Sequence, residues 1–66
     1  MRYVIVALAG GALQYFVGDG FGPNLLQAAR FRTEKDARRR SEKSVHCRRM
    51  AESGARIEVR RLSSAP

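Results

Sequence analysis

Basic side chains are concentrated in one segment of this 66-residue chain, and the chemistry that they offer is the binding of anions. Residues 30 to 49 hold nine arginine and lysine residues against three acidic ones, so this segment carries +6 of the chain's net charge of +7. Guanidinium and ammonium groups contact phosphate oxygens and carboxylates, and such an excess of charge attracts nucleic acids and acidic protein surfaces. We therefore expect a partner-binding surface in this segment.

One helix, from Thr33 to the stop at Gly54, is predicted to position most of these cations. The Thr33 hydroxyl can accept a hydrogen bond from the Asp36 N–H, and Gly54 can adopt the left-handed conformation that ends helices. On a helical wheel, small residues share one narrow face that would lie against a sheet: Thr33, Ala37, Ser41, Ser44 and Ala51, flanked by Val45 and Cys47. The opposite arc would present its side chains to solvent: Lys35, Arg38, Arg39, Lys43, His46 and Arg49.

The remaining segments predict an α+β fold in which this helix covers one face of a three-stranded antiparallel sheet of order 2-1-3. YVIVALA (3–9) is apolar enough for a central strand, and Gly10-Gly11 favours a hairpin to a second strand, ALQYFVG (12–18). ARIEVRRL (55–62) alternates as a half-buried final strand does. We expect one domain over residues 1–62, with a disordered tail at 63–66.

Two connecting segments between the hairpin and the helix are rich in turn-forming or ambiguous residues. Residues 18–24, GDGFGPN, are expected to form a loop, and Asn24 can cap a helical turn that follows it. A short extended segment is the alternative for residues 25–31. In either case we expect four apolar residues to close the end of the core: Leu25, Leu26, Ala29 and Phe31.

A solvated helix surface is the alternative to a binding surface for the basic segment. Glu34 with Arg38 and Asp36 with Arg40 have the i,i+4 order that stabilises an exposed helix, and Arg48, which falls on the small face, is expected to reach solvent or pair with Glu58. These pairs use only part of the charge. We therefore predict that a partner is contacted by Arg30, Arg32, Lys35, Arg38, Arg39, Lys43, Arg49 and the loop residue Phe21, the aromatic residue expected to be most exposed.

No motif for catalysis, a cofactor or a metal is recognisable, so we expect a non-enzymatic protein that binds neither a cofactor nor a metal. GDGFGP lacks the Lys-Ser/Thr of a phosphate-binding loop, which favours a plain connection. A single cysteine excludes an internal disulfide framework and a multi-thiolate zinc site. His46 and Cys47 would point about 100° apart on a helix, and nearby arginines could lower the pKa of Cys47, although a thiol on the helix flank is the simpler expectation.

The N-terminal stretch MRYVIVALAGGA also has features of a secretory signal peptide. We favour a first strand, because the apolar run is short and rich in strand-forming residues. No apolar run approaches the roughly 20 residues that a membrane span requires. This favours a soluble protein, and the single cysteine favours a reducing compartment, so we expect the cytoplasm of a host cell.

One part of the chain resembles small uncharacterised phage and prophage proteins of β-β-α-β order. It comprises LLQAARFRTEKDA, a basic helix and GARIEVRRL, and its pattern places Ala29 and Phe31 before a helix capped by Thr33, with Ala37 four residues on. In size and in lacking a catalytic motif, the chain is similar to small anti-CRISPR proteins. The resemblance implies a non-enzymatic phage or mobile-element accessory protein that works by occupying a surface, and it assigns no functional residues. Our concrete expectation is an anti-CRISPR-like inhibitor that docks its arginine-rich helix on an acidic surface of a nucleic-acid-handling host complex.

Two other interpretations stay open beside the inhibitor. The basic helix could bind DNA or RNA phosphates directly, with Arg30 and Arg32 beside it. The protein could also form a homodimer, because one helix covers only one face of the expected sheet. The face without a helix would then expose alternate strand residues such as Val4, Val6, Leu8, Leu13, Tyr15 and Val17.

Overall fold

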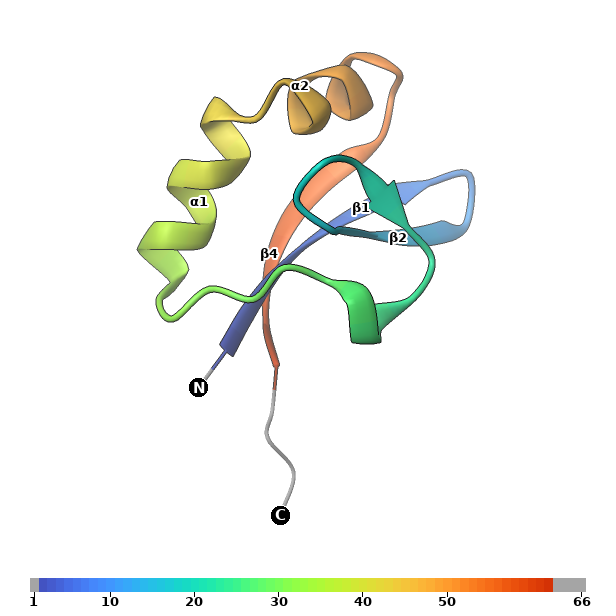
Figure 1. Ribbon diagram of the computed structural model, residues 1–66. Helices are drawn as coiled ribbons and strands as arrows, with labels where there is room; N and C mark the ends of the chain where they lie inside the picture. The colour runs from blue at the N-terminus through green and yellow to red at the C-terminus, as the bar shows by residue number, and fades with distance from the viewer. Residues whose placement is uncertain (1, 63–66) are drawn as a thin grey trace.

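Four strands form an open antiparallel sheet with two helices on one face in the computed structural model, which describes residues 2–62 (Figure 1). The strands are β1 (Arg2–Ala9), β2 (Ala12–Phe16), β3 (Phe21–Gly22) and β4 (Arg56–Leu62), in the order β3-β2-β1-β4. The α+β class and a central β1 between β2 and β4 are as expected. The sheet has one more strand than predicted, and the predicted tail at 63–66 lies outside the described residues.

The β1–β2 hairpin and the β1–β4 ladder together set the two faces of the sheet. Gly10 and Gly11 have φ angles of 55° and 81°, as a two-residue hairpin turn between strands requires. In the β1–β4 ladder, Ile5 lies opposite Val59. Because successive strand residues point to opposite faces, Ile5 packs with the helices while Val4 lies on the other face.

β3 occupies part of the segment that was expected to be only a loop. The chain reverses after β2 in a tight turn, in which the Val17 N–H donates to the Gly20 carbonyl oxygen at 2.9 Å. Phe21 then pairs with Phe16, and Gly22 with Tyr15. The glycines of this segment allow the sharp reversal, so the sheet gains a two-residue edge strand.

The predicted single helix is wrong, because the chain forms α1 (Glu34–Lys43) and α2 (Val45–Glu52) with a break at Ser44. Ser44 has an extended backbone, with ψ of 126°, and its Oγ accepts a hydrogen bond from the Cys47 N–H at 3.4 Å. A serine side chain can compete in this way with the helical backbone bonds. The two predicted ends are confirmed: Thr33 Oγ1 accepts from the Asp36 N–H at 3.0 Å, and Gly54 has φ of 102°.

The break changes which side chains of the second helix face the sheet. Ala51, placed on the buried face of the continuous wheel, is exposed, and Val45 is 51% exposed. Arg48 was expected either to reach solvent or to pair with Glu58. Its side chain is exposed to solvent, and the ion pair with Glu58 is not formed. Glu58 instead forms ion pairs with Arg56 at 3.0 Å and Arg60 at 3.4 Å, its neighbours on the same face of β4.

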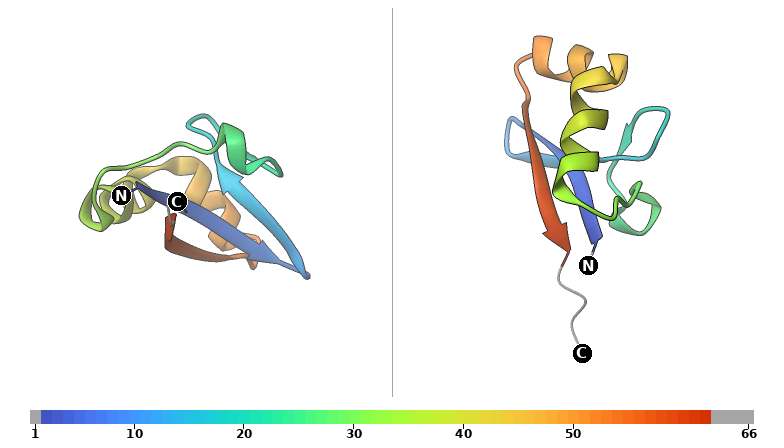
Figure 2. Two further views of the ribbon diagram at one scale, coloured as in Figure 1. Left: turned by 90° about the horizontal axis from the view of Figure 1, so that it is seen from below. Right: turned by 90° about the vertical axis from the view of Figure 1, so that its left-hand side faces the viewer.

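The core has a layer on each face of the sheet. On the helix side, Ile5 and Phe16 of the sheet pack with Ala37 of α1 and Cys47 of α2. Figure 2 shows α1 lying over β1 and β4, the two strands that it contacts. The helix-side layer is completed by half-buried residues that include Tyr3, Phe21, Ala29, Phe31, Ile57 and Val59.

A 3-10 helix, η1 (Leu25–Gln27), helps to cover the other face. The Leu26 N–H donates to Asn24 Oδ1 at 2.9 Å, so the helical turn capped by Asn24 is the alternative that forms. Leu25 and the buried Ala28 pack near Val4 and Val6. Leu26 was expected in the core but is 81% exposed, because a three-residue helix turns only some of its side chains inward.

The second sheet face is therefore less open than the homodimer hypothesis assumed. Val4 and Val6 are fully buried within one chain. Leu13 and Tyr15 stay half-buried beside them. A dimer through this face stays a prediction, but Val4 and Val6 are not available to it.

Candidate functional site

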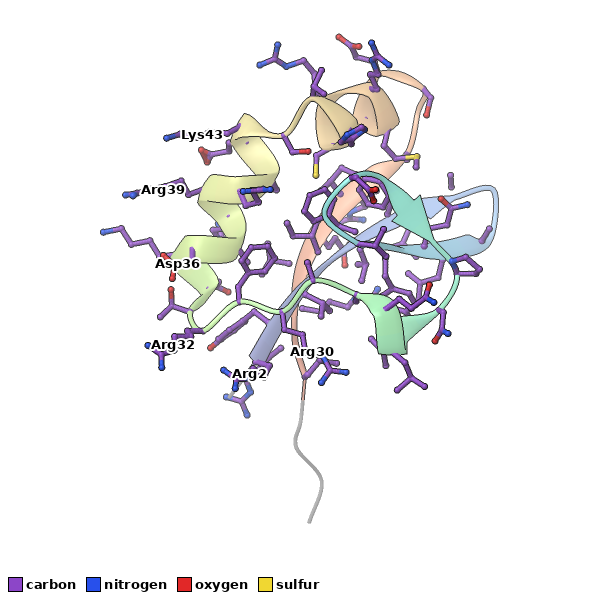
Figure 3. The ribbon with its side chains drawn as sticks, in the orientation of Figure 1. Arg2, Arg30, Arg32, Asp36, Arg39 and Lys43 are labelled. Atoms are coloured by element: carbon purple, nitrogen blue, oxygen red, sulfur yellow. The ribbon has the colours of Figure 1, made fainter. Side chains whose placement is uncertain are left out.

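Six exposed cations extend along one side of the molecule, which we call the basic edge. Its members are Arg2, Arg30, Arg32, Lys35, Arg39 and Lys43. Figure 3 shows Arg32, Arg39 and Lys43 directed away from the ribbon along the outer side of α1, with Arg2 and Arg30 at the base of the fold. Among residues 2–62, none of the six forms an ion pair. Their charge is thus available to a partner.

The α1 part of the basic edge is built by a repeat of one helical turn. Lys35, Arg39 and Lys43 are spaced four residues apart, so each lies about 6 Å further along the helix axis. Ala37, which is fully buried, fixes the inward side of the same helix. The three cations are consequently held outward in a row.

The arginines outside α1 are brought to the same edge by a strand-like bridge. The Tyr3 N–H donates to the Phe31 carbonyl oxygen, and the Phe31 N–H donates to the Tyr3 carbonyl oxygen, both at 2.9 Å. Arg2 precedes Tyr3, while Arg30 and Arg32 flank Phe31. The sequence analysis missed Arg2, because only the pairing of residues distant in the chain places it here.

A carboxylate interrupts the basic edge at Asp36, and two more, Glu34 and Glu42, line a groove beside Lys35 and Arg39. Asp36 is exposed on the same side of α1 as Arg32 and Arg39 (Figure 3). Its predicted ion pair with Arg40 is not formed. The Arg40 guanidinium instead lies 5.9 Å from the centre of the Phe16 ring, a cation–π arrangement that directs it toward the core.

Arg38 differs from the cations of the basic edge because carboxylates balance its charge. Its predicted ion pair with Glu34 is present at 3.8 Å, although both side chains are largely exposed, so the pair adds little stability. Arg38 also lines a groove between α1 and β4, where Glu42 and Glu58 face Arg56. A second groove along α1 is lined by Arg38 together with Lys35, Arg39, Glu34 and Glu42, so Arg38 borders the basic edge while its own charge is paired.

Arg49 and Phe21, also predicted to contact a partner, meet in a separate groove between α2 and the β2–β3 turn. The lining residues of this groove, which we call the α2 groove, are Gly20, Phe21, His46, Arg49, Met50 and Ser53. Phe21 is less exposed than expected, because its ring packs edge-on against Phe16 with 5.6 Å between centroids and 61° between planes. The predicted site therefore divides into the basic edge, with the paired Arg38 beside it, and the α2 groove.

Cys47 is a buried thiol on α2, in line with the simpler of the two expectations, and its pKa is not lowered. Burial raises the pKa of the thiol, which is only 2% exposed, and this effect outweighs the opposing influence of the Ser44 hydrogen bond and the Arg40 charge. The thiol is accordingly protonated near neutral pH, whereas the reactive form is the thiolate. Within residues 2–62, no group of three or more His, Cys, Asp or Glu side chains is placed to hold a metal ion.

Comparisons of the chain with protein-family models, curated proteins and solved structures give no match. In the part of the chain that the structure describes, no helix has the length and apolar character needed to cross a membrane. The basic edge and the α2 groove are consequently the features from which a function can be inferred.

Proposed function

We propose that this protein binds the phosphate backbone of nucleic acid through its basic edge. The observation that carries the proposal is the alignment of six exposed cations, from Arg2 to Lys43, without an ion pair among the described residues. Exposed cations without an ion pair contribute more binding free energy toward a polyanion than cations that neighbouring carboxylates already neutralise.

The spacing on α1 suits contact with successive phosphates along one strand. Each phosphate contact releases condensed counterions, so affinity falls with salt by a log–log slope of about 0.9 per contact for duplex DNA and about 0.7 for a single strand. Arginine adds a planar fork that can bind two phosphate oxygens, as Arg32 and Arg39 would do here.

The part of the basic edge on α1 has no side chain of the type that reads adenine. α1 contains no asparagine or glutamine, the residues that pair most specifically with adenine, and its outer row consists of Lys35, Arg39 and Lys43. Contacts to phosphates position a protein on nucleic acid without selecting a sequence. We therefore expect binding through this edge to depend on salt more than on sequence.

The proposal is tested by removing three cations from the basic edge. Arg32→Gln, Arg39→Gln and Lys43→Gln in one variant should weaken binding to labelled DNA by roughly two orders of magnitude at low salt. The salt slope should fall by about 2 to 3, because three phosphate contacts are lost. Fluorescence anisotropy from about 50 to 300 mM salt measures both quantities.

A matched control removes the same charge from outside the basic edge. It combines Arg48→Gln on α2 with Arg56→Gln and Arg60→Gln on β4, where both arginines already pair with Glu58. This variant should keep most of the affinity and of the salt slope. Equal losses in the two triple variants would show that net charge alone governs binding and would overturn the basic edge as the site.

A second candidate is docking on an acidic protein surface, as an anti-CRISPR-like inhibitor of a nucleic-acid-handling host complex would do. Asp36 favours this candidate, because a carboxylate within the basic edge repels a continuous row of phosphates but can pair with a lysine or arginine of a protein partner. The two candidates differ in what neutralising Asp36 should do: it should strengthen binding to nucleic acid in the first case and weaken binding to the protein partner in the second.

A further inference from the structure

The α2 groove differs from the surfaces beside α1 because it is lined by a cation and no carboxylate. Glu42 lines both of the grooves along α1, whereas the α2 groove contains Arg49 and His46 without an acidic partner. The acidic residues nearest in sequence, Asp19 and Glu52, are exposed and do not line it. The groove is therefore suited to an anionic or neutral ligand.

An aromatic ring is held in place at one wall of this groove. β3 pairs Phe21 with Phe16, and the edge-on contact between the two rings limits the orientation of Phe21. Met50 of α2 adds a polarisable thioether, which packs well against planar rings. A ring fixed before binding loses little conformational entropy when a planar ligand stacks on it.

The size of the groove limits the ligand to about one planar group. Its volume is 250 Å³, below the roughly 300 to 1,000 Å³ of pockets that enclose drug-sized molecules. A base inside a duplex is stacked on both faces and cannot reach a side-chain ring. An unpaired base can leave its neighbours and stack on an aromatic residue.

The chain also links this groove to the basic edge. Lys43 is the last residue of α1, and His46 and Arg49 follow at successive intervals of three residues across the break at Ser44. His46 and Arg49 supply N–H groups that can contact a phosphate next to a base held by Phe21. Cationic and aromatic contacts of this kind together are typical of single-strand recognition.

We infer that the α2 groove stacks one unpaired base on Phe21, with Arg49 and His46 on the adjoining phosphate, so that the ligand of the basic edge is single-stranded nucleic acid. This inference rests on the proposed function and adds the class of nucleic acid. Stacking on an aromatic ring requires no particular base, so the site discriminates by strandedness rather than by sequence.

The inference is tested with the intact protein and oligonucleotides that differ only in their bases. The probes are an oligothymidylate of about 15 nucleotides, an abasic strand with the same number of phosphates, and a duplex of the same length. The oligothymidylate should bind roughly tenfold more tightly than the abasic strand, since stacking of one base contributes about 1 to 3 kcal/mol. An oligouridylate of equal length determines whether RNA is accepted as well as DNA.

Substitutions in the groove separate the base contact from the phosphate contact. Phe21→Leu keeps an apolar side chain against Phe16 but removes the ring face, so oligothymidylate binding should fall to the level of the abasic strand, whose own binding should not change. Arg49→Gln should weaken both. Arg48→Gln removes the same charge from the same helix outside the groove and should have a smaller effect.

A measurement on the unsubstituted protein covers the possibility that Phe21→Leu fails to fold. In NMR titrations, the Met50 methyl and His46 ring signals should shift with oligothymidylate more than with the abasic strand, while the exposed Val45 methyls should respond equally to both. Equal binding of the oligothymidylate and the abasic strand, or tighter binding of the duplex, would overturn the base site and leave the basic edge standing. Failure of all the probes to bind would overturn the proposed function together with this inference.

Discussion

The two helices make similar contacts with the sheet and have very different outer surfaces. α1 buries only Ala37 and α2 buries only Cys47, and both side chains belong to the cluster formed by Ile5 and Phe16. The outer row of α1 is charged, whereas α2 presents an aliphatic residue at Val45 and a mixed groove wall. One small buried side chain per helix thus leaves most of each helix surface free for contacts with a partner.

The break at Ser44 separates these two surfaces. On a continuous helix, the row of Lys35, Arg39 and Lys43 would simply extend toward residues 46 and 47. Because Ser44 is extended, α2 takes a new orientation in which Cys47 is buried and Met50 lies beside Phe21. The rotation of each helix about its axis therefore determines which of its side chains face the sheet and which remain available to a partner.

The largest effect is expected from enlarging the single buried contact of α1. Ala37→Leu adds three carbon atoms at a fully buried position, and overpacking of this kind typically costs about 1 to 3 kcal/mol of unfolding free energy. Urea denaturation measures the loss. Lys35→Leu, which places the same side chain on the exposed side of the same helix, should change stability by less than about 0.5 kcal/mol.

Comparable losses in these two variants would contradict the assignment of Ala37 as the contact that fixes α1. They would indicate that α1 is destabilised by leucine at any position, and that its orientation on the sheet does not depend on close packing at residue 37.

A smaller effect is expected from removing the cap that begins α2. Ser44→Ala deletes the acceptor of the Cys47 N–H, and loss of an N-terminal cap costs about 0.5 to 2 kcal/mol. The value should lie near the lower end, because the hydrogen bond is long at 3.4 Å. Thermal unfolding followed by circular dichroism reports the change.

Ser41→Ala is the matched control for the cap. Ser41 Oγ donates to the Arg38 carbonyl oxygen at 2.8 Å within α1, and alanine is the stronger helix former, so this variant should be neutral or slightly stabilised. If Ser44→Ala were equally harmless, the separation of α1 from α2 would have to depend on packing rather than on the cap.

The smallest effect is expected at the carboxylate that interrupts the charged surface of α1. Asp36→Asn should raise affinity for DNA by roughly two- to fivefold at low salt, and the gain should diminish as salt screens the charge. Anisotropy titrations detect this difference. Glu52→Gln removes one negative charge at the end of α2, away from the basic edge, and should give a smaller gain.

A decrease in DNA affinity caused by Asp36→Asn would contradict the proposal that the phosphate backbone binds along α1. Weaker binding of a host protein complex by the same variant would favour docking on a protein surface, because Asp36 would then be losing a cationic partner.

Local patterns in the sequence were sufficient for the long strands and the helix ends. The Gly10-Gly11 hairpin, the Thr33 cap and the Gly54 stop each depend on residues that act over a few positions. β3 was not predictable in this way, because two residues form a strand only when another strand pairs with them. The break was missed because Ser44 can either continue a helix or cap a new one, and the helical wheel has no means of choosing.

The candidate site was predicted in composition but not in arrangement. Five of the six cations of the basic edge were named from the sequence, and each has the exposure expected of it: Arg30, Arg32, Lys35, Arg39 and Lys43. Arg2 was missed because its position depends on the Tyr3–Phe31 bridge. Phe21 and Arg49 were named without any indication that they share a groove, since that contact depends on the turn before β3.

The central position of β1 has a consequence for the order of folding. β2 follows β1 after a two-residue turn, so this hairpin can form as soon as it is synthesised, within microseconds. Its other neighbour, β4, pairs Val4 with Arg60 and is made last. Contacts between such distant residues slow folding, because the intervening chain must close a large loop. Until β4 pairs with β1, one edge of the most apolar strand can pair with any extended chain. Completion of the sheet therefore also protects β1 from aggregation.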